Sequence, residues 1–160
     1  MISEKLQKFV NDQIAAEMWS SNLYLQMSFF LRHEGWDGAA HWMEQQSNEE
    51  RGHALKMASY LLSRGGAANL SQTDDVPQSW ASVLDVFENV CSHECKVSEM
   101  INEIVEAAIA EKDYATENFF RGFVDEQVEE EETAFAIVDK LKKAGDAGLF
   151  FMDAELGRRK

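Results

Sequence analysis

The sequence predicts an all-α protein whose helices form a four-helix bundle, and three observations lead to this prediction. Helix-favouring residues such as Ala, Glu, Leu, Met, Gln and Lys are abundant, whereas Pro77 is the only proline. Four long segments carry apolar residues at helical spacing, and clusters of Gly, Asn, Asp or Pro separate them. The length of 160 residues, 45% of them hydrophobic, suits one substantial core, so we expect residues 1–160 to form a single domain.

The order of the expected helices also predicts how they connect. Short links within the first and the last pair imply antiparallel neighbours, whereas residues 65–79 lack a helical period and form a long crossover between the second and third helices. Each long helix should span about 40 Å at ~1.5 Å per residue, so all four match in length. A short apolar helix follows the bundle, which covers about residues 3–144. The expected helices are residues 3–32, 38–64, 80–111, 115–144 and 149–156.

Charge and cysteine content restrict the partners and the compartment. The net charge of −14, with one basic cluster in the terminal GRRK, argues against a nucleic-acid partner and favours cations. The chain starts without a secretory signal pattern and has no apolar run of about 20 residues, so we expect a cytoplasmic protein without a membrane partner. Cys91 and Cys95 lie one turn apart on one helix, where a disulfide rarely fits, and we expect free thiols.

Each predicted helix carries one glutamate near the middle of its inward-facing apolar stripe. Because mid-helix residues share a level whether a helix runs up or down, the four carboxylates should converge in one layer. A histidine lies one turn after the second glutamate, and a glutamine one turn before the fourth. The stripes contain no Lys or Arg. The layer is therefore expected to contain Glu17, Glu50, His53, Glu94, Gln127 and Glu130.

An unpaired buried carboxylate costs several kcal/mol, so four of them predict a bound multivalent cation. Carboxylate oxygens and one imidazole, without thiolate, suit iron or manganese, although zinc can compete. We expect two metal ions about 3.5 to 4 Å apart, with Glu50 bridging them. Glu17 and His53 would complete one position, and Glu94 and Glu130 the other. Tyr24 is interpreted either as a hydrogen-bond donor to a ligand carboxylate or as an ordinary core tyrosine.

These residues lie in motifs that resemble bacterial non-haem ferritin, of the ferritin-like superfamily, over essentially the whole chain. The motifs are IAAEMWSSNLYLQM with Glu17, SNEERGHALK with Glu49, Glu50 and His53, SHECK with Glu94, and DEQVEEEE with Glu126, Gln127, Glu129 and Glu130. The resemblance implies a ferritin-like bundle that assembles into a 24-subunit shell. It also implies oxidation of ferrous iron by dioxygen or hydrogen peroxide, and storage of a ferric oxyhydroxide mineral inside the shell.

The resemblance assigns roles to individual residues of the site. Glu17, Glu50 and His53 would hold the first iron, and Glu50, Glu94 and Glu130 the second, with Gln127 beside the oxygen-binding face. A third iron would bind at Glu49, Glu126, Glu129 and Glu130. No haem is expected, because Gly52 stands where bacterioferritins present a haem-ligating methionine.

Two other functions are compatible with a helical bundle of this kind. A rubrerythrin-like di-iron peroxidase or oxygenase would share the carboxylates, but the chain lacks the paired C-x-x-C motifs that deliver electrons in such proteins. A passive helical shell without an oxidation site would not require the ligand set. The remaining histidines, His33, His41 and His93, are interpreted as surface or capping residues.

Overall fold

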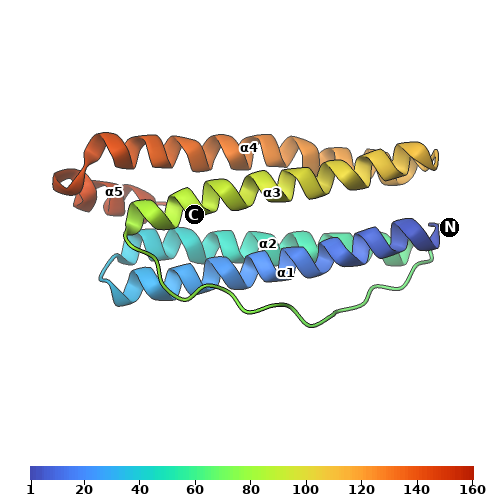
Figure 1. The fold of residues 1–160 in the computed structure, drawn as a ribbon, viewed down its shortest axis with the longest axis horizontal. Coiled ribbons are helices and arrows are strands. Elements are labelled where there is room, and N and C mark those ends of the chain that lie inside the picture. The colour runs from blue at the N-terminus through green and yellow to red at the C-terminus, as the bar shows by residue number, and fades with distance from the viewer.

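The computed structural model describes residues 1–160 and consists of α-helices without any strand. Two antiparallel helix pairs, α1 with α2 and α3 with α4, lie side by side, and α5 closes one end (Figure 1). The predicted all-α bundle with a long crossover and a short fifth helix is confirmed. The helices are α1 (Glu4–His33), α2 (Asp37–Ser63), α3 (Val83–Ala110), α4 (Tyr114–Ala144) and α5 (Leu149–Leu156), with a 3-10 turn at Asp146–Gly148.

Helix α3 starts at Val83, three residues later than predicted. The Ser82 side chain accepts a hydrogen bond from the Asp85 backbone N–H at 3.0 Å, and the Asp85 carboxylate accepts one from the Ala81 N–H at 2.9 Å. Such reciprocal capping fixes the first turn, because the initial N–H groups of a helix otherwise lack partners. The helical composition from Trp80 onward suggested an earlier start, whereas the cap sets the true one.

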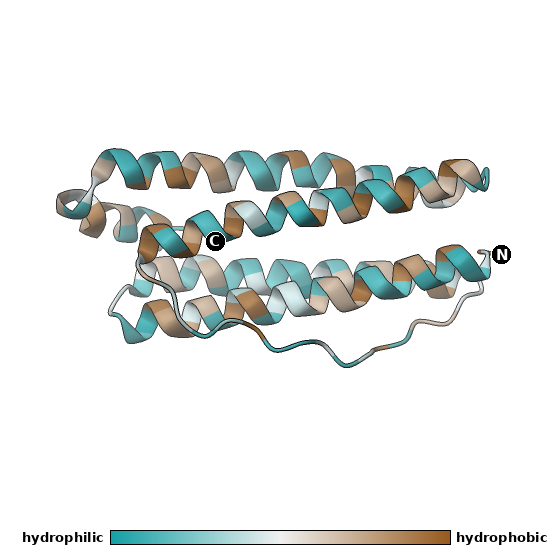
Figure 2. Ribbon diagram, in the orientation of Figure 1, coloured by the Kyte–Doolittle hydropathy of each residue, from teal (hydrophilic) through white to brown (hydrophobic).

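The crossover, residues 64–82, runs along the length of the bundle beside α1 (Figure 1). Side chains of α1 hold its backbone in place: Gln7 accepts from the Ala67 N–H at 3.0 Å, and Asn11 bonds both Ala67 and Asn69. Figure 2 shows a mixture of pale and hydrophilic residues along this segment, in contrast to the brown stripes of the helices. The crossover therefore gains its order from hydrogen bonds to α1 more than from apolar packing.

The apolar core has two main parts, and polar residues lie between them. One cluster, which includes Phe87 and Leu141, occupies the half of the bundle that carries α5. The other, which includes Met57 and Phe120, occupies the opposite half. The buried polar residues of the intervening layer include Gln13, Glu17, Gln46, Glu50, Glu94 and Gln127. The layer falls at the middle of each long helix, where the sequence predicted it.

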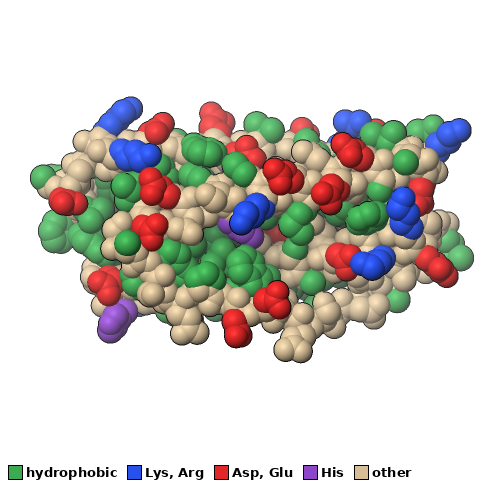
Figure 3. Space-filling view, in the orientation of Figure 1, with side chains coloured by type: hydrophobic (Ala, Val, Ile, Leu, Met, Phe, Trp, Pro, Cys, Tyr) green, Lys and Arg blue, Asp and Glu red, His purple; other side chains and the backbone are tan.

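Helix α5 docks against the start of α2 through apolar and polar contacts. Met152 and Leu156 are buried, and the Asp153 carboxylate accepts a hydrogen bond from the Ala39 N–H at 2.8 Å, so that α5 caps α2. The approach is close enough that a Cβ at Gly38 would lie 1.8 Å from the Asp153 carbonyl oxygen. The other face of α5 is exposed, and hydrophobic side chains gather at this end of the molecule (Figure 3).

Acidic side chains are spread over the face drawn in Figure 3 and outnumber the basic ones there, in keeping with the net charge of −14. None of the helices combines the length and the apolar character that crossing a membrane requires. Both cysteines are free thiols, as predicted.

Candidate metal centre

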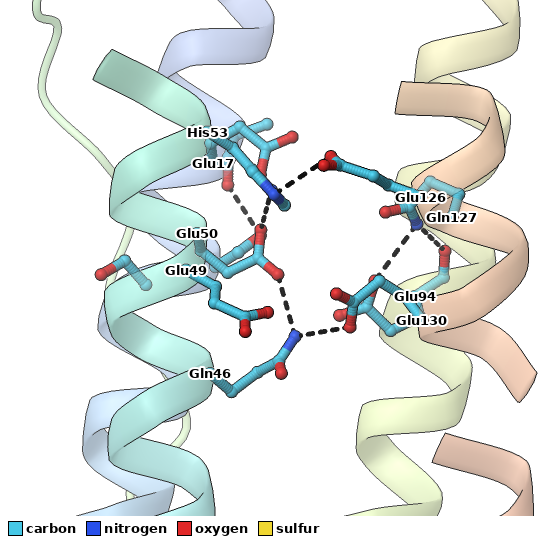
Figure 4. A network of polar contacts seen from close by, with 12 residues as sticks. Glu17, Gln46, Glu49, Glu50, His53, Glu94, Glu126, Gln127 and Glu130 are labelled. Carbon is cyan, nitrogen blue, oxygen red and sulfur yellow. Dashed lines mark hydrogen bonds and ion pairs between the residues drawn. The ribbon is translucent and has the colours of Figure 1, made fainter. Parts of the chain in front are cut away.

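The four predicted glutamates point into one layer from four helices (Figure 4). Glu17 on α1, Glu50 on α2 and Glu94 on α3 are each at most 2% exposed, and Glu130 on α4 is half-buried. No lysine or arginine is among the fully buried residues of the chain. The layer thus gathers four carboxyl groups between the two apolar clusters, with no buried lysine or arginine to pair with them.

Three of the predicted ligands already form a group. The ligand atoms of Glu17, Glu50 and His53 all lie within 4.8 Å of one another. His53 Nδ1 is 3.3 Å from Glu50 Oε2, because the two residues are one helical turn apart on α2. The same nitrogen is 3.8 Å from Glu17 Oε2 on α1. Two carboxylates and an imidazole on adjacent helices can hold one divalent cation.

The acids on the α3 and α4 side lie across from this group and do not join it. Tyr24 donates a hydrogen bond to Glu94 Oε1, and Gln127 Nε2 donates to Glu94 Oε2 at 3.1 Å. Tyr24 therefore contacts a candidate ligand, on α3 rather than on its own helix. The structure brings Glu94 and Glu130 to the same layer but does not draw them into the Glu17 group.

Two contacts span the space between α2 and α4 in Figure 4. His53 Nε2 lies 3.3 Å from Glu126 Oε2, and Gln46 Nε2 donates to Glu130 Oε2 at 2.8 Å. The imidazole and the amide therefore connect the two helix pairs on opposite sides of the centre.

The acids of the expected third position lie in different surroundings. Glu49 is half-exposed and forms an ion pair with Arg159 at 3.0 Å, and the Arg159 guanidinium stacks over Trp42 at 4.3 Å from the ring centroid. Glu129 is exposed, whereas Glu126 is half-buried beside His53. Arg159 therefore already neutralises one member of this set.

Protons are shared unequally among the first three ligands. Burial raises the pKa of Glu50 well above its usual range, and the neighbouring Glu17 adds to this. Burial alone would raise the pKa of Glu17 as well, but contacts with His53 and Glu50 outweigh it and lower that pKa. Burial alone would lower the pKa of His53, yet the two carboxylates raise it to about 11. These shifts favour the ionised form of Glu17 and the protonated forms of Glu50 and His53.

On the α3 and α4 side of the centre, the surroundings of Glu94 also favour its protonated form. Burial raises the pKa of Glu94 to about 7, where the charge of Glu130 adds to the effect and the hydrogen bonds from Tyr24 and Gln127 oppose it. Burial and the charge of Glu94 raise the pKa of Tyr24 well above its ordinary value, so the phenol remains a donor.

The donor set fits a divalent cation. Glu17 Oε2 and Glu126 Oε2 are buried oxygen atoms without a hydrogen-bond partner, and buried carboxylate oxygens are costly unless something positive satisfies them. Both atoms lie near His53, and hard oxygen donors with one imidazole nitrogen match iron, manganese or zinc.

Binding of a divalent metal should release protons and should weaken as the pH falls. The metal needs the ionised carboxylates of Glu50 and Glu94 and the neutral imidazole of His53, and the raised pKa values favour the protonated form of all three. We expect the affinity for Zn²⁺, a redox-inert probe, to decrease from about pH 8 to about pH 6. Calorimetry in two buffers of different ionisation enthalpy measures the protons released; a pH-independent affinity without proton release would contradict this assignment.

Three residues near the centre have roles that the sequence analysis missed. Gln13 Nε2 donates to Glu17 Oε1 at 2.9 Å, and Gln46 bonds both Glu50 and Glu130. The signal available for both was helical spacing, since each lies one turn before a glutamate on the same helix face. His93 was predicted to be a surface or capping residue, and this prediction is wrong. It is partly buried between α3 and α1, where its Nε2 lies 2.7 Å from Ser20 Oγ.

Of the other two histidines, His33 is exposed at the end of α1, as predicted. His41 is half-buried, and its Nε2 lies 2.6 Å from the Arg159 carbonyl oxygen. It therefore contacts the C-terminal segment instead of facing water alone.

Comparison with known proteins finds relatives along the whole chain. A family model described as the ferritin-like domain matches residues 7–144. A Bacteroides fragilis (strain 638R) protein named bacterial non-heme ferritin is 58% identical over 159 residues, 99% of this chain and 100% of the relative. A Haemophilus influenzae protein named probable bacterial non-heme ferritin-like protein is 38% identical, covering 98% of this chain and 96% of the relative. The crystal structure of an open pore ferritin from Archaeoglobus fulgidus matches with a TM-score of 0.98 and 43% identity, over 100% of both chains.

Proposed function

The chain belongs to the ferritin family, and on that premise we propose that it stores iron by oxidising ferrous ions at the centre between its four helices. The observation that carries this proposal is the buried Glu17, Glu50 and His53 group, in which one carboxylate oxygen has no hydrogen-bond partner. Such a group binds a hard or borderline cation. Because the chain belongs to the ferritin family, we take this cation to be ferrous iron.

Iron in this proposal is the substrate of the centre. Glu17, Glu50 and His53 hold the first ferrous ion, and Glu50, Glu94 and Glu130 hold the second. Tyr24 and Gln127 keep Glu94 oriented through their hydrogen bonds. The second position has no histidine, so carboxylates alone hold that ion, and the ferric product is free to leave once it is hydrolysed.

The reaction needs a pair of ions because each ferrous ion gives up one electron. Two ferrous ions together supply the two electrons that reduce dioxygen to hydrogen peroxide, or hydrogen peroxide to water. The anionic carboxylates stabilise the higher charge of the ferric product. Protons displaced from Glu50, His53 and Glu94 on iron binding are available nearby for the reduced oxygen.

Storage requires a cavity that one subunit does not enclose, so we propose that the chain assembles into a homo-oligomeric cage, the 24-mer implied by the sequence motifs. Phe150 and Phe151 on α5 are 78% and 82% exposed, and burial between copies would remove this apolar surface from water. A further iron position at Glu49, Glu126, Glu129 and Glu130 would lie between the centre and such a cavity.

Titration with ferrous iron tests the proposed function. Without oxygen, calorimetry should show two strong binding events per subunit, and admission of air should produce ferric absorbance within the protein fraction. Iron far in excess of two ions per subunit should then remain bound in a particle of many subunits. Binding no stronger than that of exposed carboxylates would refute the oxidation site and leave the passive shell as the alternative.

A further inference from the structure

Gln46 connects the two helix pairs at the level of the centre. It lies on α2, one turn before Glu50, and is 1% exposed. Its Nε2 donates to Glu130 Oε2 at 2.8 Å and to Glu50 Oε1 at 3.2 Å (Figure 4). One amide therefore contacts two carboxylates from helices that belong to different pairs.

We propose that Gln46 is the positioning residue for the second metal ion, because it holds Glu50 and Glu130 at the separation that this ion requires. The inference rests on the proposed function, in which these two carboxylates share that ion. Glu50 Oε2 faces His53, whereas Glu50 Oε1 faces Gln46, so the two oxygens of one carboxylate serve the two positions. The first position lies within α1 and α2 and does not depend on the connection to α4.

An amide suits this task better than a basic side chain. A lysine or arginine between Glu50 and Glu130 would neutralise their charge and compete with the metal, whereas a neutral N–H donor orients the carboxylates and leaves their charge in place. Gln13 and Gln127 contact Glu17 and Glu94 in the same manner. Each carboxylate of the layer thus has an amide donor, and Gln46 is the donor shared between two of them.

A purely structural role would not explain why a buried glutamine with an unpaired oxygen stands at position 46. The Gln46 carbonyl oxygen is buried without a hydrogen-bond partner, and an apolar side chain of the same length would avoid that penalty. Buried amides that contact metal ligands fix ligand orientation, and their removal typically lowers metal affinity by about 10- to 100-fold. The carbonyl oxygen therefore adds a cost to the fold, while the N–H groups serve the two carboxylates.

Stepwise titration of Gln46→Met with ferrous iron, without oxygen, tests the proposal. Methionine keeps the unbranched shape and removes both N–H donors. We expect the first binding constant to stay within about threefold of the unchanged protein and the second to weaken by about 10- to 100-fold. Gln45→Met, at a half-buried neighbouring position on α2, is the matched control and should retain both constants. Titration with Co²⁺, followed by its visible spectrum, gives the same readout without redox chemistry.

The outcomes separate this inference from the proposed function. If the unchanged protein binds no pair of ferrous ions, the proposed function fails. If it binds two and Gln46→Met also binds two with unchanged constants, or weakens both equally, only the role of Gln46 is overturned. Gln46→Leu also removes both N–H donors and adds neither charge nor a metal ligand, so it should lose the second ion selectively as well; this second variant decides the matter if the methionine variant does not fold.

Discussion

A chain carrying Glu17→Ala and Glu50→Ala is expected to oxidise ferrous iron at least about 100-fold more slowly than the unchanged protein. The two substitutions leave His53 as the only member of the three-residue group and remove the bridging carboxylate, so neither position of the pair keeps its ligands. Loss of a residue that hydrogen-bonds a metal ligand typically lowers metal affinity by about 10- to 100-fold, and loss of two ligands themselves should have a larger effect. Stopped-flow absorbance of ferric products at two ferrous ions per subunit measures the initial rate.

The matched control carries Glu4→Ala and Glu44→Ala, which remove the same charge from the same two helices. Glu4 is exposed, and Glu44 makes only a partly exposed ion pair with Arg32 at 3.4 Å, which contributes little to stability. The control should oxidise iron at the normal rate. Rapid oxidation by the Glu17 and Glu50 variant would show that the reaction takes place elsewhere on the protein.

Gly38→Ala is expected to displace α5 from the bundle. The added methyl group would lie 1.8 Å from the Asp153 carbonyl oxygen, which belongs to a helix backbone and moves only if α5 moves. Displacement exposes Met152 and Leu156, whose burial contributes about 1.5 to 3 kcal/mol each, and breaks the cap on Ala39. Thermal unfolding should shift several degrees downward, and limited proteolysis should cut within residues 145–160.

Gly52→Ala provides the comparison, because it makes the same change on the same helix. No atom lies within 4 Å of a Cβ at Gly52, and alanine in a helix interior is favoured over glycine by roughly 0.5 to 1 kcal/mol. This variant should be slightly more stable than the unchanged protein and as resistant to protease. If Gly38→Ala and Gly52→Ala had the same unfolding temperature and the same resistance to protease, the close approach of α5 to α2 would not contribute to stability in solution.

The sequence predicted the long helices well because each is an extended amphipathic pattern ended by strong breakers. The mid-helix glutamates were predictable for a related reason: helical spacing alone places Glu17, Glu50 and Glu94 on the buried face, and the structure buries all three. The start of α3 was predicted wrongly because composition describes a helix interior, whereas the cap at Ser82 depends on one side chain.

Contacts between distant parts of the chain could not be predicted from periodicity. The cap that Asp153 provides for α2 and the pairing of Arg159 with Glu49 each join residues more than a hundred positions apart. The interpretation of His93 as a surface or capping residue was wrong because helix α1 covers its side of α3, where Ser20 contacts it. Helical spacing says which residues share a face, but not which element packs against the faces beside it.

Arg159 sets a condition on any metal ion that would bind at Glu49, because the two side chains form an ion pair. Its guanidinium is held by Glu49, by the Trp42 ring and by the Trp42 carbonyl oxygen at 3.1 Å. A metal ion that takes Glu49 as a ligand must displace this tethered cation, so one positive charge is traded for another. Because the pair is partly exposed, salt screens it, and the exchange becomes easier as ionic strength rises.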